Sequence, residues 1–296
     1  GFIQNLGAVV AFSIVNSLQQ VLMNLRYFGK FYGYAESAKA LALSNLIAPQ
    51  FVQWLSINDF AGMSAEDLNR IVSDKIDNIV SKTALRIFAG DKYNEVVNAV
   101  KIALSSAMVT GVTAPNLADM LTSNARTSTA GKVGKVANMA VEVAGFFAAK
   151  TERENLTAGI IQAAMLGAKH GFVYTHAGGW SLERISEDNP TIEGRGWRDD
   201  IAYRSALPTR NVNFVRRRGS IPPYMRVKGS IARAVTLPAL LFKGFMVGMI
   251  TLTHNLGVVD ARNKPNTAGK IGAYAKTQLA DFAIVTLLAG PKKKKK

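Results

Sequence analysis

Apolar side chains recur at helical spacing along most of the chain. A helix that Asp91 can open has apolar side chains three or four positions apart, at Tyr93, Val96, Val97, Val100 and Leu104. The same spacing joins four residues near the start, namely Leu18, Val21, Leu22 and Leu25. This spacing is typical of helices that bury one side, and the alternation typical of strands is nearly absent. The pattern therefore predicts an all-α fold.

Start signals predict three further helices. Ser64 stands three residues before Asp67, a variant of the capping box, ahead of the apolar positions Leu68, Ile71 and Val72. Pro115 suits the first turn of a helix whose apolar residues are Leu117, Met120 and Leu121. Asn155 leads into "AGIIQAAMLGAKHGFV", a stretch rich in small residues. We expect this third helix to pack closely in a core.

The pattern changes between about Gly178 and Pro223. Glycines, prolines and charges replace the apolar periodicity there, and the aromatic residues include Trp180, Trp197 and Tyr203. We expect a long loop region with at most short helices. A structureless segment of that length in a compact protein is usually functional or mobile. Helical patterning resumes over residues 231–255, a last helix runs from Thr267 to about Leu288, and the lysine tail at 291–296 is expected to be disordered.

Two apolar segments are long enough to raise the question of a membrane span. Residues 2–25 carry several amide side chains, which disfavour a lone span. Residues 235–253 are the most apolar window but include Pro238 and Lys243. A buried core helix is the favoured interpretation of this window, and a membrane segment is the alternative. The start of the chain has no basic region ahead of its apolar run, so we expect no secretory signal.

The chain is strongly basic. It has 36 Lys and Arg against 20 Asp and Glu, a formal charge of +16, and without the five lysines at 292–296 the charge is still +11. Such a charge attracts polyanions, namely nucleic acid, acidic lipid or acidic protein. The chain has no cysteine, which fits a reducing compartment.

Positive charge is concentrated between Arg195 and Arg233. Nine arginines and Lys228 stand there against Asp199 and Asp200, a net charge of +8 in 39 residues. The guanidinium fork matches phosphate oxygens. Aromatic residues interleave with the arginines, and they can stack on the unpaired bases of single-stranded nucleic acid: Trp197, Tyr203, Phe214 and Tyr224. The competing interpretation is a solvated basic loop, since three adjacent arginines such as Arg216, Arg217 and Arg218 cannot share one helix face.

The sequence contains no pattern typical of a catalytic site. His170 and His176 are six residues apart, which does not fit the spacing of a helical metal pair, and His254 is remote from both. The "GKVGK" stretch at 131–135 lacks the pattern of a phosphate-binding loop, and neither a nucleophile elbow nor a thiol occurs. We therefore expect a protein that is not an enzyme and that needs no metal and no cofactor.

Three stretches resemble the nucleoproteins of segmented negative-strand RNA viruses of the phenuivirus type. The first is "FVQWLSINDFAGMSAEDLNRIV" at 51–72. The second joins "DKYNEVVNAVKIALSSAMVTG" at 91–111 to "NLTAGIIQAAMLGAKHGFVY" at 155–174. The third, "LGVVDARNKPNTAGKIGAYAKTQL" at 256–279, is the most specific. The three occur in the same order as in that family.

The resemblance implies a two-lobed helical fold with a basic cleft for single-stranded RNA and an N-terminal arm that docks on a neighbouring protomer. It suggests an arm at 1–34, an N-terminal lobe at 35–150 and a C-terminal lobe at 151–290 with the basic loop at 178–230. Leu18, Val21, Leu22 and Leu25 would form the arm's apolar face. The family's basic residues after the central helix are missing from "VTGVTAPN" at 109–116, so later basic residues would replace them. The RNA-binding candidates are Phe60, Arg126, Lys132, Lys135, Arg195, Arg198, Arg204, Arg210, Arg216, Arg217, Arg218, Tyr224, Arg226 and Lys228.

Two functions of different classes follow. The leading expectation is a viral nucleocapsid protein of the virion and the host cytoplasm, which polymerises along single-stranded RNA without reading its sequence and has the viral polymerase as a further partner. The alternative is another structural virion protein, such as a helical capsid or phage internal protein, that contacts membrane. The apolar segments at 2–25 and 235–253 motivate the alternative.

Overall fold

The computed structural model describes most of the helical body of the protein. The described residues are 20–58, 60, 63–79, 82–109, 132–176, 179–185, 201, 205, 206, 209, 249, 250, 252–258, 260–262 and 264–289. The predicted helix at 113–121, most of the basic region and the lysine tail lie outside them.

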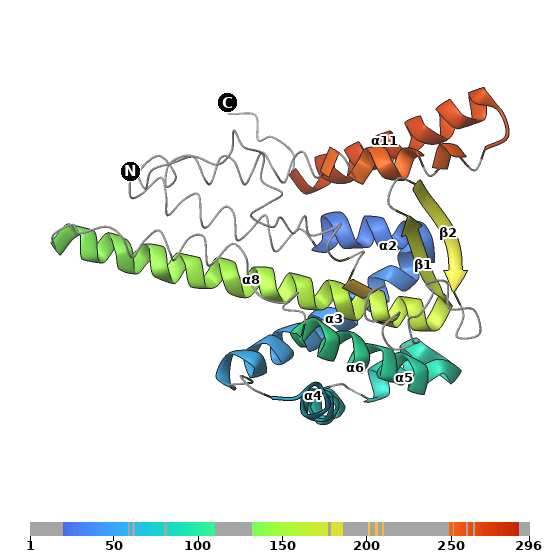
Figure 1. The fold of residues 1–296 in the computed structure, drawn as a ribbon. Helices are drawn as coiled ribbons and strands as arrows, with labels where there is room; N and C mark the ends of the chain where they lie inside the picture. The colour runs from blue at the N-terminus through green and yellow to red at the C-terminus, as the bar shows by residue number, and fades with distance from the viewer. Residues whose placement is uncertain are drawn as a thin grey trace.

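The described chain is mostly helical (Figure 1). It begins with a π-helical turn, η1 (Gln20–Asn24), and ends with a long helix, α11 (Thr267–Ala289). Between them come α2 (Leu25–Tyr32), α3 (Tyr34–Ile57), α4 (Ala65–Ile79), α5 (Lys82–Ala89), the 3₁₀ turn η2 (Gly90–Lys92), α6 (Tyr93–Val109) and α8 (Lys132–His170). A single antiparallel hairpin follows α8, made of β1 (Phe172–His176) and β2 (Gly179–Ile185).

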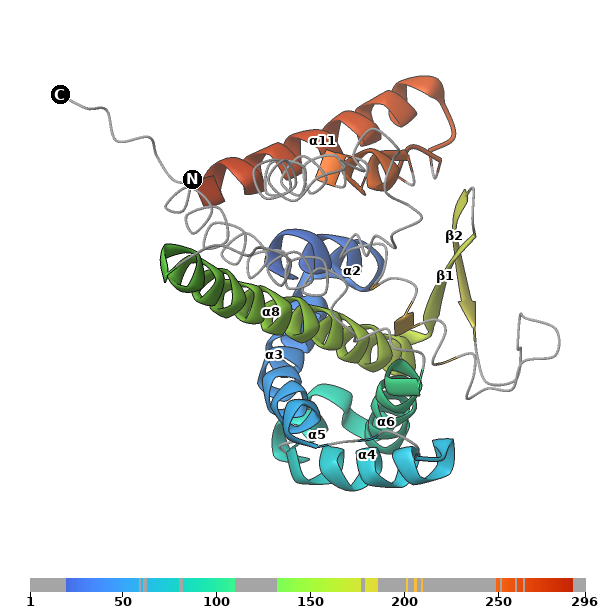
Figure 2. The same ribbon diagram turned by 60° about the vertical axis from the view of Figure 1, so that its left-hand side comes forward.

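The second half of α8 is the centre of the core. Thirteen consecutive residues, 155–167, are buried, so this part of the helix is covered on every side. α3 and α6 pack against it, and α2 packs against both α3 and α8 (Figures 1 and 2). Small side chains such as Ala158, Ala163 and Ala164 let the neighbouring helices approach closely. The predicted close-packed helix is confirmed here.

The predicted ends of that helix were wrong. α8 begins at Lys132 and not at Asn155, and it is continuous through residues 150 and 151, where the resemblance suggested a lobe boundary. Asn155 resembles a helix cap in the sequence, but it is buried and its side-chain oxygen accepts a 2.7 Å hydrogen bond from Gln20 Nε2. The division into two lobes stays a prediction.

The hairpin formed by β1 and β2 differs from two expectations. The fold was expected to be all-α, and residues from about Gly178 onwards were expected to form a loop. α8 ends at His170 because Gly171 has a φ of 92°, a conformation that glycine adopts without strain. Phe172 then pairs with Ile185, and Tyr174 with Glu183. "FVYT" is rich in aromatic and β-branched residues and precedes a Gly-Gly pair, which is the signal that predicts a hairpin.

α4 and α6 follow the sequence prediction closely. The Ser64 hydroxyl accepts a 3.1 Å hydrogen bond from the backbone N–H of Asp67 and donates a 2.8 Å bond to its carboxylate. Behind this cap Leu68 and Val72 are buried, while Ile71 is only partly buried. In α6 the predicted apolar face is also buried, at Val96, Val100 and Leu104. These helices are confirmed.

α2 and α3 are joined by a single residue. Gly33 has a φ of 87°, and its N–H donates to the Gly29 carbonyl at 3.0 Å, which closes the end of α2. The buried side of α3 recurs every three or four residues, as at Ala40, Ile47 and Phe51. α3 is also the one helix among the described residues that is long and apolar enough to cross a membrane. Of its apolar window, 39% is buried inside the chain.

The predicted N-terminal arm is part of the core where the structure describes it. Met23, Tyr27 and Phe28 are fully buried in the same cluster as residues of α3 and α8. These three apolar side chains of the predicted arm therefore have their partners within the same chain. Leu18 lies outside the described residues, Val21 and Leu22 lie in η1, and Leu25 is partly buried at the start of α2. Docking on a second protomer stays a prediction.

The last helix confirms the prediction of a helix from Thr267 to about Leu288. α11 lies on the far side of α2 from α3, next to the helical segments at 252–262 (Figures 1 and 2). Met249, Leu252 and Leu256 are buried, whereas Ile250 is exposed. The described end of the apolar window 235–253 is therefore a helix with one buried side.

Candidate nucleic-acid interface

The structure describes three of the fourteen predicted RNA-binding residues. Lys132 and Lys135 lie in the first turn of α8, and Phe60 lies in the connection between α3 and α4. The other eleven lie outside the described residues: Arg126, Arg195, Arg198, Arg204, Arg210, Arg216, Arg217, Arg218, Tyr224, Arg226 and Lys228.

Phe60 is held against α3 by an aromatic contact. Its ring lies 4.9 Å from the ring of Trp54, centroid to centroid, and Trp54 lies 5.4 Å from the buried ring of Phe51. Phe60 itself is only partly buried, and the neighbouring side chains Ile57 and Met63 are exposed. A partly exposed aromatic ring on a rigid support is a suitable platform for stacking a base.

The predicted residues of α8 are not brought to this platform. The start of α8 extends beyond the group formed by α3, α4, α5 and α6, and it lies away from α4 in both views (Figures 1 and 2). Phe60 precedes α4 directly, so the two described parts of the predicted interface are separate.

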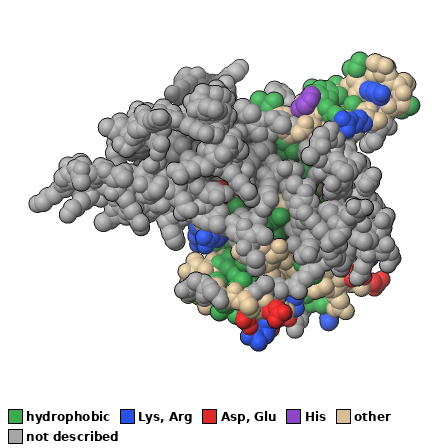
Figure 3. Space-filling model, viewed as in Figure 1, with side chains coloured by type: hydrophobic (Ala, Val, Ile, Leu, Met, Phe, Trp, Pro, Cys, Tyr) green, Lys and Arg blue, Asp and Glu red, His purple; other side chains and the backbone are tan. Residues whose placement is uncertain are grey.

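The described helical body carries the smaller part of the chain's excess positive charge. It holds 19 of the 36 Lys and Arg but 13 of the 20 Asp and Glu, so it accounts for six of the sixteen excess positive charges. Figure 3 shows basic and acidic side chains interspersed on the lower helices. Several are paired directly, for example Lys101 with Asp77 at 2.7 Å and Arg70 with Asp67 at 3.1 Å. Most of the positive excess therefore belongs to the segments outside the described residues.

One acidic side chain neutralises cations at the meeting point of two helix ends. Glu36, in the first turn of α3, accepts hydrogen bonds from Lys169 Nζ at 2.6 Å and Lys39 Nζ at 2.8 Å. His170 Nε2 lies 3.5 Å from the same carboxylate. The bonds from Lys169 and then Lys39 lower the pKa of Glu36 to about 2, against the opposing effect of desolvation. Lys169 also lies 4.6 Å from the centroid of the Phe88 ring. These cations are engaged within the protein.

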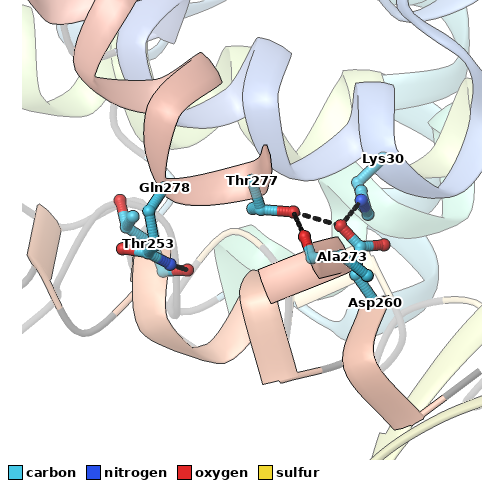
Figure 4. Close-up of polar contacts among 6 residues, drawn as sticks. All are labelled: Lys30, Thr253, Asp260, Ala273, Thr277 and Gln278. Atoms are coloured by element: carbon cyan, nitrogen blue, oxygen red, sulfur yellow. Dashed lines mark hydrogen bonds and ion pairs between the residues drawn. The ribbon is translucent and has the colours of Figure 1, made fainter. Parts of the chain in front are cut away.

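A second polar cluster joins α2 to the C-terminal helices (Figure 4). Lys30 donates to the Asp260 carboxylate, which also accepts a hydrogen bond from the Thr277 hydroxyl. Arg26, only 1% exposed, donates to the Thr253 hydroxyl, and Gln278 Nε2 donates to the Thr253 carbonyl at 3.0 Å. We call this set the α2–α11 seam: Arg26, Lys30, Thr253, Asp260, Thr277 and Gln278. The sequence pattern does not predict it, because Arg26 and Lys30 are 227 and 230 residues from their partners in the C-terminal helices.

The described histidines and acidic residues do not form a metal site. Among the described residues no group of three His, Asp or Glu side chains is placed to hold a metal ion. His170 lies beside Glu36, and His254 Nδ1 hydrogen-bonds with the Tyr274 hydroxyl at 2.8 Å. His176 is the last residue of β1.

No protein-family model, no curated protein and no solved structure matches this chain. The resemblance to phenuivirus nucleoproteins therefore rests on the three quoted stretches alone. Of these, the first spans the Phe60 platform and the third spans Asp260 and most of the described α11.

Proposed function

We propose that this protein is a structural, non-enzymatic nucleocapsid protein, which polymerises along single-stranded RNA and binds it through phosphate contacts without reading its sequence. The observation that carries the proposal is the net charge of +8 between residues 195 and 233, where nine arginines interleave with aromatic side chains. Arginine forks bind phosphates, and aromatic rings stack on unpaired bases of any sequence.

The charge distribution of the helical body supports this assignment. Glu36, Asp67 and Asp77 pair with cations of the same body. A scaffold that is less basic than the segments it supports leaves most of the attraction for phosphate in those segments. The scaffold then supplies shape, and the arginines supply affinity.

Salt dependence is the property that tests the proposal. Each neutralised phosphate releases counterions, so the logarithm of affinity falls with the logarithm of salt concentration in proportion to the contacts made. Filter binding to single-stranded RNAs of different sequence should give nearly equal affinities at each salt concentration. A strong preference for one sequence would contradict packaging.

A matched pair of triple variants assigns the contacts. Replacing Arg216, Arg217 and Arg218 with Ala should reduce the salt slope by about 2, since each contact to a single strand contributes about 0.7. The control replaces Lys39, Arg70 and Lys150 with Ala, which removes the same charge from exposed positions of the helical body. The control should keep the wild-type slope. Equal effects of both variants would mean that only net charge matters and that the arginine run makes no specific contact.

A second candidate function is a structural virion protein of another class that contacts membrane. α3 supports it, because this helix has the length and composition of a membrane span and leaves Leu46 and Ile57 exposed. Flotation of the purified chain with neutral lipid vesicles separates the candidates. Partition into neutral lipid would favour the second function, and recovery as ribonuclease-sensitive rings or filaments would favour the first.

A further inference from the structure

α11 makes its described contacts from one side only. Thr277 contacts Asp260, and Gln278 contacts Thr253 (Figure 4). Tyr274 contacts His254, so these three positions of α11 define an inner face. The backbone of the segment at 252–262 is close here, since a Cβ added at Gly257 would lie 2.8 Å from the Tyr274 ring. The inner face is thus fully used in attaching α11 to the body.

A second face of α11, which lies beside the inner face, is apolar and exposed. It consists of residues three or four positions apart, which we call the outer face: Ala268, Ile271, Gly272, Ala275 and Leu279. Ile271 is 66% exposed and Leu279 is 68% exposed. A Cβ added at Gly272 would meet no atom within 4 Å. Two large aliphatic side chains on an open helix face are a surface for which the described chain offers no cover.

Lysines surround the outer face. Lys264, Lys270 and Lys276 are exposed, and no Asp or Glu occurs between residues 264 and 279. Figure 3 shows this part of the molecule as apolar and basic side chains side by side. Over residues 260–296, nine basic residues stand against Asp260 and Asp281, a net charge of +7. The partner of this face is therefore negatively charged and also accepts aliphatic side chains.

We propose that the outer face of α11 binds the surface of an anionic lipid bilayer. Aliphatic side chains insert at the boundary between headgroups and acyl chains, and lysines beside them contact anionic headgroups. Nucleic acid fits this face less well, because Ile271 and Leu279 cannot stack on bases and Tyr274 is engaged with His254 on the inner face. The lysines within the helix place it in the plane of the interface and not across the bilayer.

This inference is independent of RNA binding. The arginines proposed to contact RNA lie between residues 195 and 233, whereas the lipid surface uses α11. Variants of α11 should therefore change lipid binding and leave RNA filter binding unchanged. If the wild-type chain binds anionic lipid but does not bind RNA, the proposed function is contradicted and the lipid surface is not.

Flotation of the full chain tests the inference with phosphatidylcholine vesicles made with and without phosphatidylserine. The wild type should float only with the anionic vesicles. The double variant Ile271→Glu, Leu279→Glu should bind them at least tenfold more weakly. Its matched control is Met63→Glu, Ile87→Glu, which changes two exposed apolar residues outside α3 and α11 and should bind as the wild type does. A second variant, Lys270→Gln, Lys276→Gln, keeps the apolar face and should weaken binding about fivefold for each lysine.

Three results would overturn the proposal. Equal flotation with neutral and anionic vesicles would indicate insertion of an apolar helix instead. Unchanged binding by both α11 variants would show that the outer face has no contact with lipid. An equal loss in the Met63, Ile87 control would place the contact elsewhere. Circular dichroism of each variant confirms that the helical body is intact.

Discussion

Lys169 in the last turn of α8 donates a 2.6 Å hydrogen bond to Glu36 in the first turn of α3, across 133 residues of sequence. The acid stands at a helix N-terminus and the base at a helix C-terminus, so both charges also complement the helix dipoles. His170 adds a second base at the same C-terminus. This contact attaches the end of the central helix to the beginning of the helix packed against it.

Stability should therefore depend on pH through Glu36. Its pKa is lowered from 4.5 to about 2, so its contribution is fully present above about pH 4.5 and is lost as the pH falls towards 2. Glu36→Gln should remove stability on the order of 1 to 3 kcal/mol at neutral pH and flatten this acid limb. Urea unfolding at a series of pH values measures both effects. Glu66→Gln, on the exposed surface of α4, is the matched control, and an equal flattening there would contradict the assignment.

The approach of Phe172 to α8 leaves no free space for a side chain at Gly167. A Cβ added at Gly167 would lie 2.3 Å from the Phe172 ring, which is itself buried. Gly167→Ala should destabilise the protein by about 1 to 3 kcal/mol. Gly272→Ala is the control in an open position of α11 and should be stabilising by up to about 1 kcal/mol. Thermal unfolding compares the two, and recovery of stability when Phe172→Leu is added would identify the ring as the cause.

The α2–α11 seam should behave as a coupled unit. In a double-mutant cycle, Lys30→Met and Asp260→Asn should show a coupling energy of about 0.5 to 3 kcal/mol, because the two groups are in direct contact and partly buried. The exposed pair Arg70 and Asp67 provides the control, with a coupling of about 0.5 kcal/mol or less. Hydrogen exchange gives a second measurement. Faster exchange should be confined to α11 and residues 252–262, and a uniform increase over α3 and α8 would contradict a local role.

The N-terminal arm can be tested more sharply than by removing all of residues 1–34. Such a deletion removes Met23, Tyr27 and Phe28 from the core and should unfold the protein. Deleting residues 1–19 alone keeps this packing. If those residues dock on a neighbouring protomer, the shorter deletion should give a folded, RNA-binding monomer by light scattering after ribonuclease treatment. Unchanged oligomers would contradict the arm.

Local signals predicted much of the fold. The cap at Ser64 and the apolar periods of α4 and α6 are properties of short segments, and the structure confirms them. Asn155 misled because an amide suits both a helix cap and a buried hydrogen bond, and only the distant Gln20 decides between them. The pairing of Lys169 with Glu36 could not be predicted either, since no local pattern joins residues 133 positions apart.

The candidate site was less predictable than the fold. The sequence predicts RNA contacts from charge and aromatic content, and most of those residues lie outside the described part of the chain. Of the rest, Phe60 has a definite aromatic support, while the start of α8 lies elsewhere. The exposed side of α11 was not predicted, because its apolar residues resemble those of a core helix. Only the packing shows which side of the helix is covered.

The buried centre of α8 also provides a position at which the rate of core opening can be measured. The natural chain has no cysteine, so one introduced thiol would be the sole reactive group for a thiol reagent. The variant Ala163→Cys places a small side chain at a buried position. Its thiol would react only when the helices around it separate. Its labelling rate would then report the frequency with which the core opens, free or bound to RNA or lipid, without any change to the surfaces that bind them.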